Sequence, residues 1–515
     1  MGALLINLKD AVMESLLNAL FPVSDMLAVL FVLAIGIAAV TLVVFYIIDV
    51  RQSKDAVRHN FPVLGRFRYL FSSLGEFFRQ YFFAMDREEM PFNRAERDWV
   101  ERSSEGKDNT VAFGSSKVLT QPGTPLFVNC PFPVLDEDAK EAPAVVIGPY
   151  AREPYTAKSL INISGMSFGA ISKPAVRALS AGAKQAGCWM NTGEGGLSPF
   201  HLEGGCDIVF QMGTAKYGVR NADGGLDDDK LCEVAAHAQV KMIELKMSQG
   251  AKPGKGGILP AAKVTPEIAT IRGIPAAEAS ISPNRHPEID SIGQLLDFIA
   301  HTRDITGLPV GFKAVIGGYG WIEDMCKEIH IRGIESAPDF ITIDGGDGGT
   351  GAAPMPLMDS VGLTVKESLP IVVDALIKYG LRDRIKVITS GKLITPAEVA
   401  WAYCAGTDFV TSARGFMFAL GCIQALKCNK NTCPTGITTH KASLQNGLNP
   451  AEKSVRVKNF VGKINYGTNL IAHSCGVSHP RALGRKHCRI VQQGPVSVSM
   501  ADLLPEPETL NEYRK

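Results

Sequence analysis

Three cysteines in the C-terminal half of the chain have a spacing that suits a metal cluster. Cys422, Cys428 and Cys433 form the pattern C-x5-C-x4-C, and Pro434 follows the last of them. Thiolates are the soft ligands that iron–sulfur clusters require, so three of them this close together could hold such a cluster. Buried free cysteines would give the same pattern, and the spacing alone leaves both interpretations open.

A glycine-rich segment follows a short apolar run at residues 340–343 and is the second candidate for chemistry. Five of the seven residues from 345 to 351 are glycine, among them Gly345, Gly346, Gly348 and Gly349. Glycine costs backbone entropy inside a helix or strand, so this run predicts a loop whose N–H groups are free to point at an anion. A flexible linker is the alternative, but linkers of this kind are usually of low complexity and rich in Ser or Pro.

Two further loops have the composition of a phosphate site. Residues 390–392 read Ser-Gly-Lys with Gly391 at the centre, and residues 412–415 read Ser-Ala-Arg-Gly with Ala413 and Arg414 at the centre. Together with the glycine-rich segment they predict a cradle for a phosphate group. The sequence has no Walker A motif, which argues against a nucleoside triphosphate. A bound mononucleotide such as FMN fits better, and a phosphorylated substrate is the alternative.

Acidic and basic residues form a third group of candidates. Glu194 lies in Asn-Thr-Gly-Glu-Gly-Gly at residues 191–196, where a carboxylate has little purpose in a core or a helix. It either accepts backbone hydrogen bonds or acts as a general acid whose pKa burial raises. Five further residues lie in or beside a long segment at residues 247–290: Lys246, Gln249, Lys252, Lys255 and Arg272. They are either a solvated basic surface or an anion site for a small dicarboxylate.

These candidates fall at the ends of short apolar runs that alternate with helical patterns, the last pattern covering residues 415–426. Eight such runs over about 270 residues are typical of a (β/α)8 barrel, the TIM barrel. An open doubly wound sheet is the alternative, but its phosphate fingerprint would follow the first strand and not the sixth. A barrel would gather the candidates on one face. The predicted strands are residues 160–164, 188–191, 208–211, 242–246, 310–315, 340–344, 387–389 and 409–412.

Composition and the N-terminal region indicate a membrane protein that does not act on nucleic acid. The 515 residues include 53 Lys and Arg against 52 Asp and Glu, and this balance argues against a nucleic-acid partner. Residues 26–48 are a run of 23 without a charge, long enough for one transmembrane helix and longer than the apolar part of a typical signal peptide. Lys and Arg gather after this run, which predicts a single-pass protein with its catalytic domain in the cytoplasm.

The chain divides by composition into five segments. Residues 1–25 are predicted to be an amphipathic N-terminal segment, residues 26–48 the transmembrane helix, and residues 49–155 a juxtamembrane and connecting region. Residues 156–440 are predicted to form the barrel with its cysteine loop, and residues 441–515 a helical and irregular tail. Within the connecting region, the aromatic and Arg-rich residues 58–104 are expected to dock on the main domain and not on the membrane surface.

From about residue 155 to 440 the chain resembles the FMN-binding synthase domain of glutamate synthase, and as a whole it is similar to stand-alone, membrane-anchored members of that family. The resemblance implies a (β/α)8 barrel that binds FMN and a three-iron four-sulfur (3Fe-4S) cluster. It also implies reduction of 2-iminoglutarate, made from 2-oxoglutarate and ammonia, to L-glutamate. The motifs that carry it are GMSFGAIS at 165–172, NTGEGG at 191–196, KMSQGAKPGKGG at 246–257, ISP at 281–283, the segment 344–352, LRDR at 381–384 and the cysteine segment 421–434.

The resemblance also implies roles for individual residues. Cys422, Cys428 and Cys433 correspond to the cluster ligands. Glu194 and Lys246 correspond to catalytic positions, with proton donation as the role of Glu194. The residues that correspond to the 2-oxoglutarate site are Lys246, Gln249 and Arg272. The residues that correspond to the FMN site are Met166, Ser167, Asn191, Lys313, Gly345, Gly346, Gly348, Gly349, Gly391, Ala413 and Arg414.

The sequence also departs from the complete glutamate synthases. They carry an N-terminal amidotransferase domain, whereas the first cysteine here is Cys130, so we expect no glutaminase activity from this chain alone. Nitrogen would come from ammonia, an amine or a partner glutaminase, and electrons from a ferredoxin or a flavoprotein reductase. The alternative functions are an N-methylglutamate synthase-type transferase, an FMN dehydrogenase of another 2-oxo or amino acid, and a non-catalytic membrane electron-transfer module.

Overall fold

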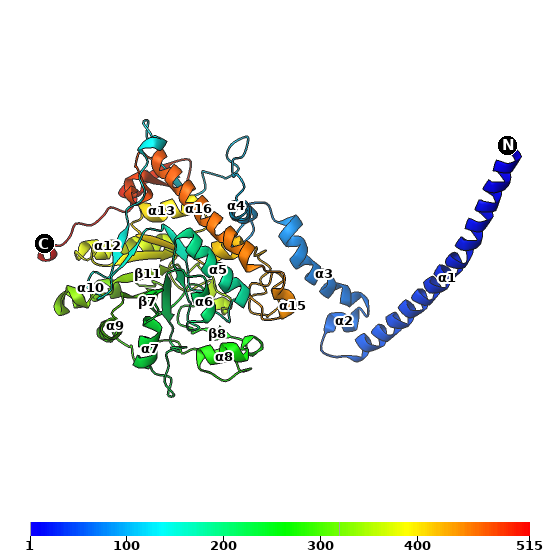
Figure 1. The fold of residues 1–515 in the computed structure, drawn as a ribbon, viewed down its shortest axis with the longest axis horizontal. Helices are drawn as coiled ribbons and strands as arrows, with labels where there is room; N and C mark the ends of the chain where they lie inside the picture. The colour runs from blue at the N-terminus through cyan, green and yellow to red at the C-terminus, as the bar shows by residue number, and fades with distance from the viewer. Residues whose placement is uncertain (1, 319, 515) are drawn as a thin grey trace. The chain divides into compact units, whose positions relative to one another are not determined.

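The computed structural model describes residues 2–318 and 320–514, except for the side chains of residues 2–12, 14–24, 76, 77, 79 and 80. The chain forms two compact units, Met1–Arg94 and Ala95–Lys515. The larger unit contains every predicted strand and every candidate residue of the site (Figure 1).

The larger unit is built around a closed barrel of eight parallel strands, which confirms the predicted TIM barrel. The order around the barrel is β4, β5, β6, β7, β10, β11, β12 and β13, so each strand pairs with the next in the chain and the last pairs with the first. Most strand residues are buried on both faces, as parallel sheets covered by helices require. The strands are β4 (Ile161–Ile163), β5 (Met190–Asn191), β6 (Ile208–Met212), β7 (Val240–Lys246), β10 (Val310–Ala314), β11 (Phe340–Asp344), β12 (Lys386–Ser390) and β13 (Phe409–Ser412).

Helices follow the strands and surround the barrel in Figure 1. Several begin and end at residues that cap helices well: the Ser172 hydroxyl accepts a hydrogen bond from the N–H of Ala175, and Gly187 ends the same helix with φ +67°. The predicted helix at 415–426 is wrong in its second half, because the chain leaves the helix at Leu420 and turns at Gly421 with φ +100°. The helices are α5 (Lys173–Ala186), α6 (Pro199–Glu203), α7 (Asp228–Ala235), α9 (Ile292–Thr306), α10 (Gly320–Arg332), α12 (Val365–Lys378), α13 (Pro396–Cys404) and α14 (Arg414–Ala419).

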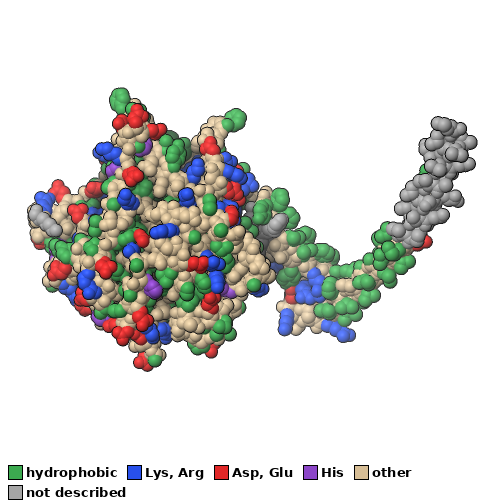
Figure 2. All heavy atoms as spheres, viewed as in Figure 1, with side chains coloured by type: hydrophobic (Ala, Val, Ile, Leu, Met, Phe, Trp, Pro, Cys, Tyr) green, Lys and Arg blue, Asp and Glu red, His purple; other side chains and the backbone are tan. Residues whose placement is uncertain are grey.

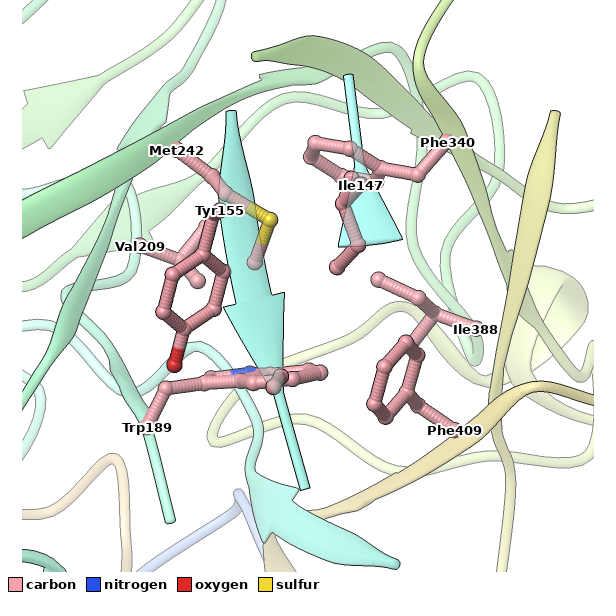
Figure 3. Packing of buried hydrophobic residues seen from close by; sticks show 9 residues of the cluster. Ile147, Tyr155, Trp189, Val209, Met242, Phe340, Ile388 and Phe409 are labelled. Atoms are coloured by element: carbon pink, nitrogen blue, oxygen red, sulfur yellow. The ribbon is translucent and has the colours of Figure 1, made fainter. Parts of the chain in front are cut away.

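A hydrophobic cluster fills the barrel at the end where the strands begin (Figure 3). The hairpin of β2 (Val145–Ile147) and β3 (Tyr155–Ala157) contributes Ile147 and Tyr155 to this cluster. Trp189 packs edge-on against Phe409 with ring centroids 4.9 Å apart. Because this end is closed by apolar side chains, polar chemistry is confined to the opposite end, where the strands finish.

Elements outside the barrel extend the larger unit. The long helix α16 (Pro450–Ser474) packs on α5 and α13. Helix α4 (Arg94–Ser104) packs on α16 in turn, with Trp99 and Phe460 rings 6.3 Å apart and a 3.0 Å hydrogen bond from the Asn459 amide to the Ser104 carbonyl. A small antiparallel sheet joins β1 (Pro125–Phe127), β14 (Cys488–Val491) and β15 (Ser497–Ser499). Two further segments, β8 (Ile258–Leu259) and β9 (Ser280–Ile281), pair within the long segment after β7, which also carries α8 (Pro266–Arg272).

The smaller unit begins with one continuous helix, α1 (Gly2–Arg51), where the sequence predicted two segments that meet at residue 25. Its part Asp25–Arg51 is long and apolar enough to cross a membrane, a property that N-terminal signal sequences share. The prediction that residues 1–25 are amphipathic depends on side chains, and almost all of these side chains lie outside the part of the chain that the structure describes. Helices α2 (Ala56–Asn60) and α3 (Leu64–Phe78) and the π-helical turn η1 (Arg79–Phe83) complete this unit. Within residues 58–104, which were expected to dock on the main domain, α4 packs on α16 of the larger unit, whereas α3 belongs to the smaller unit.

Candidate functional site

An ion pair between Glu194 and Lys246 lies at the end of the barrel where the strands finish. Glu194 is in the loop after β5 and Lys246 is the last residue of β7, and the Lys246 Nζ lies 2.8 Å from the Glu194 Oε1. Glycines on neighbouring loops leave room for this carboxylate, since a Cβ on Gly257 would lie 2.3 Å from the Glu194 Oε1. The structure thus brings together two of the predicted catalytic residues that are far apart in the sequence.

The surrounding charges reverse the pKa shift that the sequence suggested for Glu194. Burial raises the pKa of Glu194, but Lys246 opposes this through Coulombic attraction and a hydrogen bond, and Lys252 and Arg272 add to the effect. The net result is a pKa of Glu194 below its ordinary value, so the expectation of a raised pKa is wrong and Glu194 is a carboxylate at neutral pH. The pKa of Lys252 is also lowered, to about 8, but here burial is the cause because it disfavours the charged ammonium form.

Arg272 is the last residue of α8, and its guanidinium is almost fully buried. One end donates to the Ser280 hydroxyl at 3.2 Å, and the other approaches the Ser167 hydroxyl and the Phe168 carbonyl at 3.4 Å each. The guanidinium lies 5.0 Å from the centre of the Tyr217 ring. Within the described residues Arg272 has no carboxylate within ion-pair distance, and its Nε has no hydrogen-bond partner. A buried cation without an anionic partner is energetically costly, which points to an anion that is supplied from outside the chain.

A second ion pair joins β10 to β11. The Lys313 Nζ lies 3.1 Å from the Asp344 Oδ2, which also accepts a 2.9 Å hydrogen bond from the N–H of Gly250. Burial lowers the pKa of Lys313, but Asp344 and Glu244 outweigh this and hold the pKa above its ordinary value. Lys313 therefore keeps a positive charge inside the barrel mouth, as the predicted role beside an anionic flavin would require.

Glu244 is a buried acidic residue that the sequence analysis missed. Its carboxylate accepts hydrogen bonds from the Asn191 amide at 2.8 Å, the Gln211 amide at 2.6 Å and the Thr342 hydroxyl at 2.5 Å. It thereby ties β5, β6, β7 and β11 together and lines a small internal cavity together with Lys313. Its position two residues before Lys246 was an available signal, because alternate residues of a strand point to the same side.

The loops after β4 and β5 pack tightly against each other. A Cβ on Gly193 would lie only 2.5 Å from the backbone nitrogen of Ser167 and 2.9 Å from the carbonyl carbon of Met166. Asn191 supports this contact, because its side-chain oxygen accepts a 2.9 Å hydrogen bond from the N–H of Gly193. The predicted cofactor residues Met166, Ser167 and Asn191 thus form one buried corner of the site, next to Arg272.

The glycine-rich segment is packed differently from the predicted anion cradle. The N–H groups of Gly345, Gly346 and Gly348 donate to the carbonyls of Ser390, Leu363 and Gly345, so they are not free for an anion. The glycines instead permit backbones to touch: a Cβ on Gly250 would lie 2.3 Å from the carbonyl oxygen of Gly345.

The neighbouring loops keep the N–H groups that an anion needs. In the described part of the chain the N–H groups of Gly391 and Lys392 have no backbone acceptor, and Ala413 and Arg414 begin α14, where N–H groups have no partner within the helix. The Arg414 guanidinium reaches back to the Thr350 carbonyl at 3.0 Å and would clash with a Cβ on Gly349. Gln249 also contacts this loop, because its amide donates to the Thr350 hydroxyl at 2.7 Å.

The three cysteines of the C-x5-C-x4-C pattern line one cavity just after α14. Cys422, Cys428 and Cys433 share this cavity with Arg414 and Phe418, among other residues. Among the described residues no group of three or more Cys, His, Asp or Glu side chains is close enough together to hold a metal ion. The buried Lys263 was not singled out from the sequence, and its Nζ donates to the Cys428 carbonyl at 3.3 Å and to the Ala170 carbonyl at 2.6 Å. Lys263 therefore joins the cysteine loop to the loop after β4.

Comparisons with known proteins show what this chain is similar to. Residues 126–478 match the family described as the conserved region in glutamate synthase. A glutamate synthase large subunit-like protein, YerD of Bacillus subtilis, is 38% identical over 88% of this chain and 94% of its own length. An archaeal glutamate synthase (NADPH) of Methanocaldococcus jannaschii is 34% identical over 58% of this chain, which spans about half of that relative, 56% of its length. The flavin-binding domain of flavocytochrome b2 from baker's yeast aligns with a TM-score of 0.44 and 12% identity, covering 82% of this chain and 86% of its own.

Proposed function

The chain belongs to the glutamate synthase family and is an oxidoreductase of that family, and from this premise we propose that it reduces 2-iminoglutarate, formed from 2-oxoglutarate and ammonia, to L-glutamate. The observation that carries the proposal is the buried guanidinium of Arg272, which has no carboxylate partner within the described residues. A dicarboxylate needs a cation at each end once water is excluded, and Lys246 and Lys252 supply further positive charge near Glu194.

We further propose that the barrel face binds one FMN. The residues fit this cofactor: free N–H groups after β12 and at the start of α14 suit its phosphate, and the charged Lys313 suits a negatively charged ring. The predicted contacts of Met166, Ser167 and Asn191 would come from the buried corner beside Arg272. Bound FMN would supply the hydride, and a bound iron–sulfur cluster would supply single electrons.

The cysteine cavity supports the proposed 3Fe-4S cluster through its donor set. Three thiols line the same cavity, and it lies directly after α14, whose first residue Arg414 also contacts the glycine-rich loop. Burial raises the pKa of Cys433, but hydrogen bonds from Thr435 and Thr438 outweigh this and lower it, which favours the thiolate at this one position. Burial raises the pKa of Cys422 to about 11, so Cys422 would lose its proton only on binding the cluster. Cys422, Cys428 and Cys433 would be its ligands.

The chain's own residues would do the rest of the chemistry. Arg272 would hold one carboxylate of the substrate, and the ion pair with Glu194 would fix the Lys246 ammonium near the reacting carbon. Glu194, as a carboxylate, would orient Lys246 through their ion pair. Lys252, with a pKa of about 8, would be the group that gives up a proton near neutral pH. This transfers the proton-donor role from Glu194, as the sequence suggested, to a neighbouring lysine.

Two alternatives use the same site. An N-methylglutamate synthase-type enzyme would take methylamine in place of ammonia, and an FMN dehydrogenase would take another 2-oxo or amino acid. A non-catalytic electron-transfer module is disfavoured, because such a module would have no use for the buried Arg272 and the Glu194–Lys246 pair. We also propose that α1 anchors the chain in a membrane with the barrel on the cytoplasmic side. Electrons would come from a partner protein, and nitrogen from free ammonia or from a partner that delivers it.

The experiment that tests the proposal uses the full-length protein in detergent, photoreduced without oxygen. Adding 2-oxoglutarate and ammonium together should reoxidise the flavin and produce L-glutamate, whereas either alone should not. Methylamine in place of ammonium identifies the N-methylglutamate alternative by its product. A flavin that stays reduced with both amines would contradict glutamate synthesis by this site.

A further inference from the structure

Helix α3 starts directly beside the end of α1, and buried ion pairs hold it there. Asp49, in the last turn of α1, is fully buried, and its carboxylate lies 2.6 Å from the Arg58 guanidinium and 2.8 Å from that of Arg66. The N–H of Val63 donates to the same carboxylate at 3.1 Å. The Arg66 guanidinium also lies 4.0 Å from the centre of the Phe45 ring, one turn further back in α1. The first turn of α3 is therefore at the same level as the last two turns of α1.

One face of α3 is a continuous apolar stripe that is exposed. Its members recur every three or four residues, which places them on one side of an α-helix. Their exposed fractions run from 37% at Leu74 to 68% at Leu64. The other side of the helix is polar and carries Arg66, Tyr69, Ser72 and Ser73, of which Tyr69 donates a hydrogen bond to Asp55. The members of the stripe are Leu64, Phe67, Leu70, Phe71, Leu74 and Phe78.

Length and charge decide what can cover this stripe. The 15 residues of α3 extend only about 22 Å, short of the roughly 30 Å of a bilayer core, and the helix carries Arg66 and Arg68. It therefore does not suit a second crossing. Aromatic side chains are enriched at membrane interfaces, and Lys and Arg near a membrane surface are attracted to anionic lipid headgroups. Figure 2 shows hydrophobic side chains along α3 and the adjoining part of α1, with basic ones gathered at α2 between them.

We infer that the apolar stripe of α3 is a lipid-binding surface that lies in the bilayer interface beside the end of α1. This inference rests on the proposal that α1 crosses a membrane. It adds a second membrane contact, made by α3 at the depth of the bilayer interface. The ion pairs of the buried Asp49 would fix the bend at which the chain passes from the crossing helix α1 to the interfacial helix α3. The stripe would be immersed among the upper acyl chains, and the basic residues Arg51, Lys54 and Arg68 would face the headgroups.

A pair of single tryptophan substitutions tests this in the full-length chain reconstituted in nanodiscs. Phe71→Trp introduces a probe in the stripe, and Ser72→Trp introduces the same probe one residue away on the polar side. Lipids brominated in the upper acyl chain quench tryptophans that touch them, and the emission of the four native tryptophans is subtracted using the parent protein. We expect roughly threefold more quenching of the added emission for Phe71→Trp than for Ser72→Trp, as an interfacial helix requires.

Four outcomes would overturn the inference, and together they separate its failure from that of the membrane anchor. Equal quenching of the two probes would contradict an oriented helix. A Phe71→Trp emission that is blue-shifted but not quenched would show that protein covers the stripe, either a second copy or the barrel unit. Release of the parent protein from the bilayer by alkaline carbonate would contradict the crossing of α1, and with it this lipid contact. Retention in the bilayer without quenching would contradict the lipid contact of α3 alone.

Discussion

At the scale of single residues, burial decides which cations of the site are available for chemistry. Lys246 is held by Glu194 and Lys313 by Asp344, whereas Arg272 has only neutral partners among the described residues. Lys252 is buried beside Lys246, and burial is the largest cause of its lowered pKa. The four basic groups therefore differ in how fully their charge is balanced, because their anionic neighbours differ.

Replacing Arg272 by alanine should weaken the use of 2-oxoglutarate and leave FMN binding intact. Losing one partner of a buried charge pair costs about 2–5 kcal/mol, so kcat/KM for 2-oxoglutarate should fall roughly 30-fold or more. Arg220→Ala is a matched control, because Arg220 also faces the Tyr217 ring, at 5.9 Å, but lies at the edge of the site. If Arg272→Ala stays within about threefold of the parent in steady-state kinetics, the dicarboxylate site is elsewhere.

The lowered pKa of Lys252 predicts how the reaction depends on pH. Its ammonium form is present below about pH 8 and is lost above it, so a reaction that takes a proton from Lys252 should slow as the pH rises through this value. Lys252→Arg should remove that alkaline decline and lower kcat, because arginine keeps its proton. Lys255→Arg should leave the decline in place. An alkaline limb that is unchanged in Lys252→Arg would assign it to another group.

At the scale of elements, each loop after a strand is supported by a partner from another strand. Gly250, after β7, donates to Asp344 at the end of β11, and Arg414 of α14 donates to Thr350 in the loop after β11. Lys263 ties the cysteine loop to the loop after β4. Some substitutions should therefore remove the group bound by a single loop, whereas others should destabilise the barrel that supports all of the loops.

Substituting the cysteines should remove the proposed cluster from its loop and leave the FMN site intact. Cys422→Ser, Cys428→Ser and Cys433→Ser should each remove iron while FMN remains, because the thiols line a cavity of their own beyond β13. Electron paramagnetic resonance of the oxidised protein and its iron and FMN contents measure this. Cys232→Ser, a half-buried cysteine near α9 that contacts the Ile305 carbonyl, should keep both groups. Unchanged iron in all three loop variants would rule out this ligand set.

The motif LRDR at residues 381–384 has a structural role at the opposite end of the barrel. Arg384 and Arg303 lie 2.9 Å from the two carboxylate oxygens of the fully buried Asp339, which precedes β11. Asp339→Ala leaves two buried guanidinium groups without their anion and should lower the free energy of unfolding of the larger unit by about 3–5 kcal/mol. The exposed Asp383→Ala should change it by no more than about 0.5 kcal/mol. Chemical denaturation compares the two, and equal losses would contradict the role of this network.

At the scale of the whole molecule, one closed barrel separates an apolar end from a polar end, and the polar end carries the proposed chemistry. The hydrophobic cluster at the opposite end closes the barrel with Trp189, Phe409 and their neighbours. A second unit, with α1 and α3, carries exposed apolar surface and none of the candidate site residues. The proposed functions therefore divide between the two units, with catalysis assigned to the larger unit and membrane attachment to the smaller one.

The protein should bind one FMN per chain without a covalent bond. FMN should stabilise it by about 2.7 kcal/mol when present at 100 times its Kd, since it binds only the folded barrel. Riboflavin is the matched control, because it lacks the phosphate that the N–H groups after β12 and at α14 would hold, and it should stabilise far less. Thermal melting with each flavin, and acid release of the cofactor from purified protein, measure this. Recovery of FAD, or equal stabilisation by riboflavin, would contradict the phosphate site.

Much of this protein could be predicted from its sequence because the relevant signals are local. The eight strands, their parallel order and the loops that follow them are visible as short apolar runs between helical patterns, since period and composition belong to neighbouring residues. The cysteine spacing and the length of the apolar run in α1 can likewise be read from neighbouring residues. Helix ends were less certain: the last turn predicted for α14 is replaced by an irregular loop at Gly421.

Only the tertiary structure decided which groups meet, because pairing and burial depend on segments far apart in the chain. The pKa of Glu194 falls instead of rising because Lys246, from another strand, contacts it. The N–H groups of Gly345 and Gly346 are consumed by Ser390 and Leu363, so the free donors are on neighbouring loops. Helix α3 is held beside the end of α1 because Arg58 and Arg66 pair with the buried Asp49. The charge, the free hydrogen-bonding groups and the exposure of a residue depend on its neighbours in the folded structure. These neighbours cannot be read from the linear order of residues.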